Sequence, residues 1–593
     1  MKRAGLLLAL LAVVVAACEV APPASKPAPK SSPLAKADTK FFSGDYDGAE
    51  KDYQSLIDGG TPNARAHYVL LLDYENRFVE AVQQAQQAVK DNSDSVSLSR
   101  LTRALDWSED VTGAVTAGAK SIKATPVDPL AHLFYGEALA DAGRFAEARD
   151  QLRAGQKAAA DAYTRAEGDR DWANYYRARG DSLQELNHLE LSLKSQPDFP
   201  ERSLELSRYQ SGHANAGKAI QLLRDVAKKA ATQYGVLTAE GDAAFLQGNA
   251  PVAIELYNSA LKVRPNGATA TLGLSEVDVA VSRDFNTAHD RLLTALKADP
   301  KAGNVYQFLR FLDSLVLKKD PTQELAFAQP PPTDGITAAR KDALAAVNAT
   351  RATVGVGAVA ENPALAESAL AHGYFFLFNF GQSSLNGDGV HFEDPSLPGS
   401  FGHNSSDRAA HFGYAQSSIT SEVISHVFIA PAAVERWVDT VYHRYPITAR
   451  EAKLAGYGEA QVGGLSIQVL DFGIAGAQPG ELIAYPPANS TGVPAAFRGG
   501  EVPDPVPTAN YPIGYPITLQ APLDATLAVG KADLTGPAGN AVDAYQIPPG
   551  TNNLAPNEFA MLAKSPLATG KYSVTVTGTV NGAAFAKSWQ FSV

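Results

Sequence analysis

The stretch ITSEVISHVFIAPAAVERWVDTVYHRY, residues 419–445, lies at the centre of the region 391–473 around which this chain is organised. Six of the chain's 11 histidines fall in that region or shortly before it. Two of them, His391 and His443, flank one glutamate, Glu422. Two imidazoles and a carboxylate can bind a divalent metal or move protons when a fold brings them together. The alternative is that these side chains cap turns and satisfy hydrogen bonds inside a core.

Short motifs on both sides of this stretch point to a known family. In chain order they are Asn348, Arg351 and Gly355, then Asn362-Pro363 and Ala369-Leu370-Ala371-His372, and finally Gly456-Tyr457-Gly458 and Asp471-Phe472-Gly473. Over residues 340–474 this order resembles the CAP superfamily (cysteine-rich secretory, antigen-five and pathogenesis-related proteins) in its cysteine-free bacterial form. The resemblance implies an α/β domain, an α-β-α sandwich, which we place at residues 336–476.

The same resemblance implies a pocket. His391 matches the family's first pocket histidine, Glu422 the glutamate of its Glu-Asn-Ile segment, and His443 the histidine of its Trp-x(5)-His-Arg segment. On this basis His391 and His443 would hold a metal, Zn²⁺, and Glu422 would be the catalytic base. Two positions depart from the family pattern: Val423 replaces an asparagine, and Thr440 stands where other members place a second acidic residue.

The N-terminus predicts a lipid anchor. A basic start and an apolar run end in Val15-Ala16-Ala17-Cys18, which resembles a bacterial lipobox, so we expect a signal peptide at 1–17 and lipid on Cys18. The alternative is an ordinary secretory signal. Cys18 is the chain's single cysteine, which excludes internal disulfides and CxxC zinc sites. Residues 18–36 form a tether rich in Pro, Ala and Ser. We expect the protein at the cell envelope, on the outer membrane or extracellular face.

Residues 37–317 predict a repetitive helical region. The turn glycines Gly44, Gly143 and Gly248 are each followed five residues later by alanine. A Lys-x-x-Pro pattern recurs with gaps of 71, 68 and 35 residues between its prolines. This resembles a tetratricopeptide array, an all-α solenoid of roughly eight hairpins. We expect a protein or peptide partner in its groove, and the alternative is a spacer. None of the scattered histidines (His67, His132, His188, His213 and His289) is predicted to be a ligand.

The remainder predicts a linker at 318–335 and an all-β domain at 480–593. Period-two residues at 572–578 and the Asn581-Gly582 turn indicate a hairpin. Pro-rich connectors between short strands favour an immunoglobulin-like sandwich, in which no residues are predicted to form a site.

Charge and motifs narrow the function. The net charge of −12 provides no basic face, which argues against nucleic acid as a partner. The first hypothesis is a non-enzymatic envelope protein, bound to the membrane through lipid on Cys18, that recruits a protein through its repeats. Its CAP-like cleft would bind a metal, a lipid or a cell-wall fragment. The second is a metal-dependent hydrolase of peptide or glycan that uses His391, His443 and Glu422. A third, lipid or sterol carriage in the cleft, rests on the family analogy.

Overall fold

The structure is a computed structural model. It describes residues 32–75, 77–108, 110–179, 181–212, 216–230, 233–300, 302–328, 334–415, 419–425, 430–462 and 465–593. The predicted signal peptide, Cys18 and most of the tether lie outside the described residues, as does His213. Within the described part, no helix is long and apolar enough to cross a membrane.

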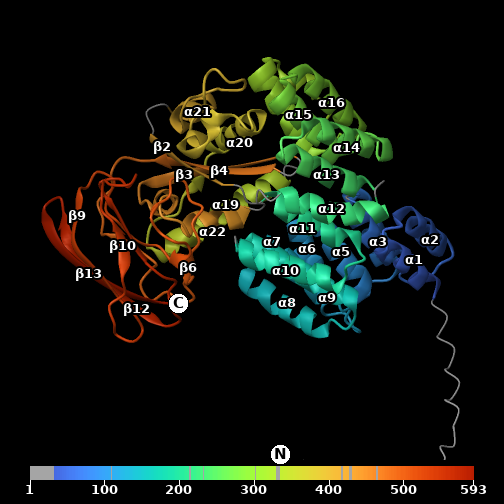
Figure 1. Cartoon of the computed structure of the whole chain (residues 1–593), viewed down its shortest axis with the longest axis horizontal. Coiled ribbons are helices and arrows are strands. Elements are labelled where there is room, and N and C mark those ends of the chain that lie inside the picture. The colour runs from blue at the N-terminus through green and yellow to red at the C-terminus, as the bar shows by residue number, and fades with distance from the viewer. Residues whose placement is uncertain are drawn as a thin grey trace, which may run out of the picture.

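The N-terminal half is a solenoid of helical hairpins, in which each odd-numbered helix packs against the next (Figure 1). Its helices are α1 (Pro33–Phe42), α2 (Tyr46–Asp58), α3 (Ala64–Tyr74), α4 (Phe78–Asp91), α5 (Ser95–Trp107), α6 (Val111–Ser121), α7 (Ala131–Asp141), α8 (Phe145–Ala158), α9 (Ala162–Ala178), α10 (Ser182–Ser195), α11 (Pro200–Gly212), α12 (Ala216–Ala230), α13 (Tyr234–Leu246), α14 (Ala250–Val263), α15 (Ala268–Val277), α16 (Phe285–Ala298) and α17 (Gly303–Phe311). Two π-helical turns, η1 (Asp278–Ser282) and η2 (Leu312–Leu317), extend α15 and α17.

Local sequence explains these hairpins. The predicted turn glycines, Gly44, Gly143 and Gly248, have φ values of 87°, 69° and 74°, a region that favours glycine. The alanines that follow them at the fifth position are fully buried between helices, where a small side chain allows close stacking. The helical solenoid that the sequence predicts is therefore present.

The solenoid closes on itself. Phe41 of α1 contacts Phe199, which directly precedes α11, at a ring-centroid distance of 5.1 Å, and Tyr46 of α2 donates a 2.7 Å hydrogen bond to Glu201 of α11. Gln233 also donates a hydrogen bond to the carbonyl of Gly44. Segments more than 150 residues apart thus lie side by side, so α1–α11 close into a ring, and α13–α16 continue beyond it towards the next region (Figure 1).

Charged side chains fill the inside of this ring. Tyr74 of α3 donates to Glu167 of α9 at 2.9 Å, and Arg202 of α11 donates to Tyr74 at 3.2 Å. Arg103 of α5 lies 2.6 Å from Glu167 and 3.2 Å from Glu137 of α7. All five side chains are at most 5% exposed. Because the inner helices meet one another, the partner groove that we predicted there is filled between α3 and α11.

The helices continue into the next region without a break in the core. Within the predicted linker 318–335 lie α18 (Pro321–Glu324) and the first residues of α19 (Asp334–Thr353). Phe311 of α17 stacks on Tyr374 with ring centroids 5.0 Å apart. One hydrophobic core includes residues from α15–α17 and from the following sheet. The two regions therefore form a single packed unit here.

A four-stranded sheet with helices on both faces follows. Its order is β1-β3-β4-β2, from β1 (Ala360–Glu361), β2 (Ile419–Ser425), β3 (Ala452–Val462) and β4 (Leu465–Ile474). The helical segments of this region are α20 (Pro363–Phe378), η3 (Ser383–Leu385), η4 (Gly387–His391), α21 (Ser405–His411), α22 (Ala430–Val438) and α23 (Arg444–Thr448). Helix α20 shares one core with Ile467 and Val469, whereas α19 and α22 share another with Leu470 and Phe472. The region therefore has three layers, helix, sheet and helix.

The C-terminal region is rich in strands. Its sheets have the orders β10-β11-β8-β5, β13-β12-β9 and β6-β7. The strands are β5 (Ile483–Tyr485), β6 (Ala496–Phe497), β7 (Ile513–Gly514), β8 (Ile517–Gln520), β9 (Leu527–Thr535), β10 (Ala544–Ile547), β11 (Glu558–Ala563), β12 (Lys571–Val580) and β13 (Ala583–Ser592). The predicted turn is present: Asn581 and Gly582 have φ values of 50° and 82° and join β12 to β13.

Candidate functional site

His391 and Glu422 lie next to each other. His391 ends η4, in the loop between α20 and α21, and Glu422 lies in the edge strand β2. His391 Nδ1 is 2.9 Å from Glu422 Oε1, and their side chains are 27% and 4% exposed. With Nδ1 donating to the carboxylate, Nε2 carries the lone pair. The arrangement presents one oriented imidazole that can accept a proton or bind a single ligand atom.

Arg408 of α21 holds both partners. Its guanidinium forms a short ion pair with Glu422 Oε2 and donates to the carbonyl of His391 at 3.0 Å. Burial acts to raise the pKa of Glu422, but the charges of Arg408 and His372 and the hydrogen bond from His391 outweigh it, so that this pKa lies far below its usual range. Burial acts to lower the pKa of Arg408, but the negative charges of Glu422 and Glu393 outweigh that effect, so the pKa of Arg408 is raised. The Glu422 carboxylate therefore remains ionised at neutral pH.

A second His–Glu pair supports the first from inside the domain. His372 Nδ1 lies 3.0 Å from Glu393 Oε1, and His372 Nε2 lies 2.9 Å from the carbonyl oxygen of Val390. Both side chains are fully buried. His372, which ends the Ala369-Leu370-Ala371-His372 motif, is therefore packed inside the domain. Glu393 was not singled out, although its position two residues after His391 was a usable signal.

Asp471 lies opposite Glu422 in the β2–β4 pairing and is also fully buried. Ser368 donates a 2.8 Å hydrogen bond to it. Burial, followed by the neighbouring charge of Glu422, raises the pKa of Asp471 well above its ordinary value. Asp471 therefore holds a proton more readily than Glu422, whose pKa is lowered.

His443, the second predicted metal ligand, has a different partner. Its Nδ1 lies 2.9 Å from Oε1 of Glu501, which belongs to the C-terminal region, and the amides of Val441 and Tyr442 donate to the same carboxylate. The next residue, Arg444, donates to the carbonyl of Pro516 at 2.8 Å. The His-Arg motif thus joins the three-layer region to the C-terminal strands.

The predicted metal set does not assemble. Among the described residues, the ligand atoms of His391, Glu422 and His443 do not come within 4.8 Å of one another as a set. The structure brings His391 and Glu422 together and leaves His443 with Glu501. The physical reason is that Glu501 accepts three backbone amides as well as the imidazole, a match that fixes the motif locally.

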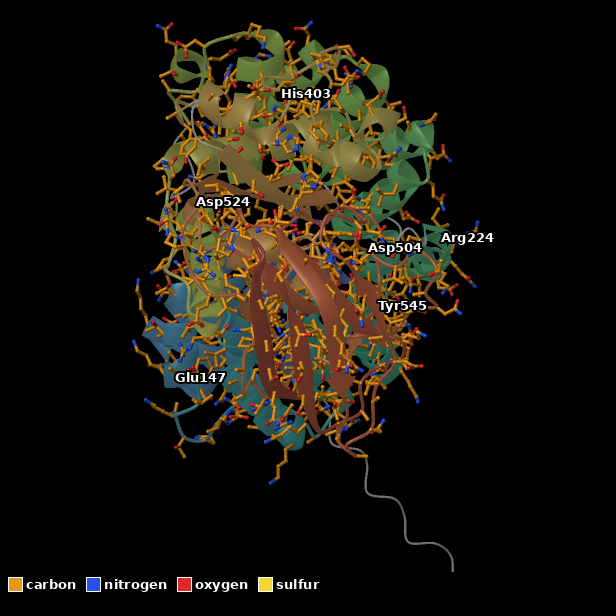
Figure 2. The ribbon with its side chains drawn as sticks, turned by 90° about the vertical axis from the view of Figure 1, so that its left-hand side faces the viewer. Glu147, Arg224, His403, Asp504, Asp524 and Tyr545 are labelled. Carbon is orange, nitrogen blue, oxygen red and sulfur yellow. The ribbon has the colours of Figure 1, made fainter. Side chains whose placement is uncertain are left out.

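The residue that follows His391 belongs to an exposed aromatic pair. Phe392 is 44% exposed, and its ring stacks on the exposed His403 with centroids 5.2 Å apart and an interplanar angle of 24°. Figure 2 shows His403 toward the upper end of the molecule, above the C-terminal strands. We call His391, Phe392 and His403 the imidazole–phenyl surface. Phe392 belongs to none of the motifs that the sequence offers.

Comparisons with known proteins concern the helical region. Residues 108–163 and 238–277 match the family model of the tetratricopeptide repeat. A search of curated proteins gave no significant match. These repeats suggest protein–protein interaction.

Solved structures of repeat proteins are similar at low identity. A tetratricopeptide repeat protein from Parabacteroides merdae is 11% identical with a TM-score of 0.28, over 41% of this chain and 96% of that chain. The Cut9-Hcn1 hetero-tetramer of APC/C is 16% identical with a TM-score of 0.33, over 47% of this chain and 55% of that chain. YrrB, a repeat protein with an unusual peptide-binding site, is 13% identical with a TM-score of 0.22, over 31% of this chain and 95% of that chain.

Proposed function

We propose that this chain is a non-catalytic, lipid-anchored protein of the bacterial cell envelope. Its helical repeats recruit a protein partner, and the imidazole–phenyl surface binds a cell-wall fragment. The support comes from three sources: the lipobox-like sequence that ends at Cys18, the repeats, and the geometry around His391.

The contacts that Glu422 already makes are the reason that we prefer a binding role over a catalytic one. An efficient general base has a pKa near the working pH. The pKa of Glu422 lies far below that range because Arg408 and His372 outweigh the effect of burial. Its two oxygens already face His391 and Arg408. A proton transfer to this carboxylate would have to break an ion pair in the interior, which opposes the role we first assigned to it.

The imidazole–phenyl surface supplies contacts of the kind that ligands use. An exposed aromatic face beside a few polar groups is typical of a ligand-contact surface. Phe392 offers apolar area, and His391 and His403 offer ring nitrogens. Sugar rings present both apolar faces and hydroxyl groups, so a glycan fragment of the cell wall fits this combination.

A titration tests the ligand proposal. We would use the full chain with Cys18→Ser and follow binding of soluble peptidoglycan fragments by calorimetry. We expect saturable binding that weakens at least about tenfold in Phe392→Ala and in His391→Gln, because each loses a direct contact. Leu523→Ala, at a 43% exposed site in the C-terminal region, is the matched control. Equal affinity in all variants, or no saturable binding, would refute the proposal.

The partner would dock on the outside of the repeats. Because the inner helices fill the ring, an outer helix such as α10 is the available surface, where Leu183 and Leu191 are 51% and 37% exposed. Cross-linking of the full chain in intact cells should lose its main product in Leu183→Glu and Leu191→Glu and keep it in Val502→Glu, a control at a 54% exposed site. An unchanged product would exclude this surface.

The anchor has its own test. Metabolic labelling with a fatty acid should mark the wild-type chain, and Cys18→Ser should abolish the label and release the protein from membranes. Label retained in Cys18→Ser would contradict the lipid assignment.

A further inference from the structure

The last helical hairpin contains a cluster around His289, a residue that the sequence did not predict to be a ligand. His289 of α16, Asp313 of η2 and Glu324 of α18 have ligand atoms that all lie within 4.8 Å of one another. His289 Nε2 lies 3.4 Å from Asp313 Oδ1 and 3.3 Å from Glu324 Oε1. The three side chains come from three separate elements, and the sequence spaces them by up to 35 residues.

Asp313 is a buried carboxylate without a hydrogen-bond donor. It is fully buried, and within the described part of the chain neither of its oxygens accepts a hydrogen bond. A buried carboxylate in such a place normally pairs with a charge or coordinates a metal.

In the preceding hairpin, the aspartate equivalent to Asp313 has a partner of opposite charge. The carbonyl of Asp278 in η1 accepts from the amide six residues later, as does that of Asp313 in η2, so the two aspartates are structurally equivalent. Asp278 has a cationic partner: Arg291 approaches it at 3.1 Å. In the last hairpin the corresponding carboxylate faces an imidazole and a second carboxylate instead.

The histidine is oriented as a ligand. Its Nδ1 lies 2.9 Å from Asp290 Oδ1, and its Nε2 lies 3.0 Å from the ammonium of Lys319, an exposed side chain. A lysine donates to Nε2 only if that nitrogen carries the lone pair, so Nδ1–H donates to Asp290. A carboxylate behind the ligating ring in this way is common in metal sites.

We propose that His289, Asp313 and Glu324 bind one divalent cation, Zn²⁺ by their donor set. Imidazole with carboxylates suits zinc, and ligand atoms about 2.0–2.1 Å from a tetrahedral ion are about 3.3–3.4 Å apart, as His289 Nε2 is from each carboxylate. The Lys319 ammonium occupies the cation's side of Nε2 and swings into solvent when the ion enters.

The ion would fasten α18 to the last hairpin. Leu325 and Ala328, at and just beyond the end of α18, help to line a cavity of about 480 Å³ whose other walls include Tyr306 and Phe311 of α17 and Phe412 of the three-layer region. Joining α16, η2 and α18 through one ion would hold this wall in place. Zinc therefore has a structural role at the junction, apart from the surface at His391.

The test is a zinc titration of the full chain with Cys18→Ser, freed of metal by chelation, with Ca²⁺ and Mg²⁺ as comparison ions. We expect one Zn²⁺ per chain, and binding weakened at least about tenfold in Asp313→Asn and in Glu324→Gln. Asp278→Asn, the equivalent position with its own arginine partner, should keep the wild-type affinity.

Two further readouts separate binding from folding. At the same zinc concentration, zinc should raise the melting temperature of the wild type by more than that of Asp313→Asn, since the asparagine fits the site without the charge. Lys319→Met should bind zinc more tightly because the competing ammonium is gone. Unchanged affinity in Asp313→Asn and Glu324→Gln, a Lys319→Met affinity that does not improve, or zinc binding lost only in His391→Ala would overturn the proposal.

Discussion

The stability of the helical ring should depend most strongly on its charged interior, and Glu167→Gln tests this expectation. Glu167 is fully buried and faces Arg103 at 2.6 Å, Arg202, and the hydroxyl of Tyr74 at 2.9 Å. Glutamine has nearly the same shape but no charge, and its NH₂ group must point a donor at one of the two guanidinium groups. The substitution leaves two buried cations partly uncompensated.

The magnitude follows from the burial. Removing one partner of a buried ion pair costs about 3–5 kcal/mol of unfolding free energy, because the remaining charge stays desolvated. Burial acts to raise the pKa of Glu167, but Arg103 and Arg202 outweigh it and hold this pKa far below its usual range. The carboxylate is therefore charged in the folded chain at neutral pH, where the loss should appear.

The assay is urea unfolding followed by circular dichroism, combined with hydrogen exchange of α5 and α9. Glu147→Gln is the matched control, since Glu147 lies 2.7 Å from Arg144 on the outside of α8 with a side chain that is 57% exposed (Figure 2). An exposed pair of this kind contributes less than about 1 kcal/mol. If Glu167→Gln costs no more than Glu147→Gln, the ionic interior does not hold the ring together.

Three further changes test other parts of the chain. Gly458→Ala should destabilise the three-layer region, because a Cβ there would lie 2.1 Å from the amide nitrogen of Leu370 in α20. An unchanged midpoint in a thermal melt would contradict this close approach. Glu501→Gln should speed hydrogen exchange at β6 and β7, since it weakens the acceptor for His443, whereas unchanged exchange would contradict this role. The free energy of unfolding should fall between about pH 4 and pH 7 and then level off. One cause is Glu435, because burial raises its pKa to about 7 against the opposing charge of Arg179. The folded chain therefore keeps a proton in this range that the unfolded chain releases. Glu435→Gln should flatten that slope, and an identical pH profile would count against the assignment.

Much of the secondary structure could be predicted because it depends on neighbouring residues. Gly44 and its equivalents mark turns, and buried alanines mark helix contacts, so the solenoid follows from a local repeat. Asn581-Gly582 likewise specifies a hairpin by its positive φ values. The resemblance of the motifs placed His391, Glu422 and His443 in one pocket, and the structure brings only the first two of these together.

Contacts between distant segments could not be predicted in the same way. Sequence spacing does not show that His443 pairs with Glu501 instead of with Glu422. It also does not show that Tyr74 donates a hydrogen bond to Glu167 inside the ring, or that Asp313 lies next to His289. A polar side chain binds whichever partner the packing brings within about 3 Å, and packing depends on the whole core. The sequence by itself determined the hairpins, their turns and their small interfacial residues. Only the tertiary structure decided which charges meet in the interior, because desolvation allows few pairings and the complete fold selects among them.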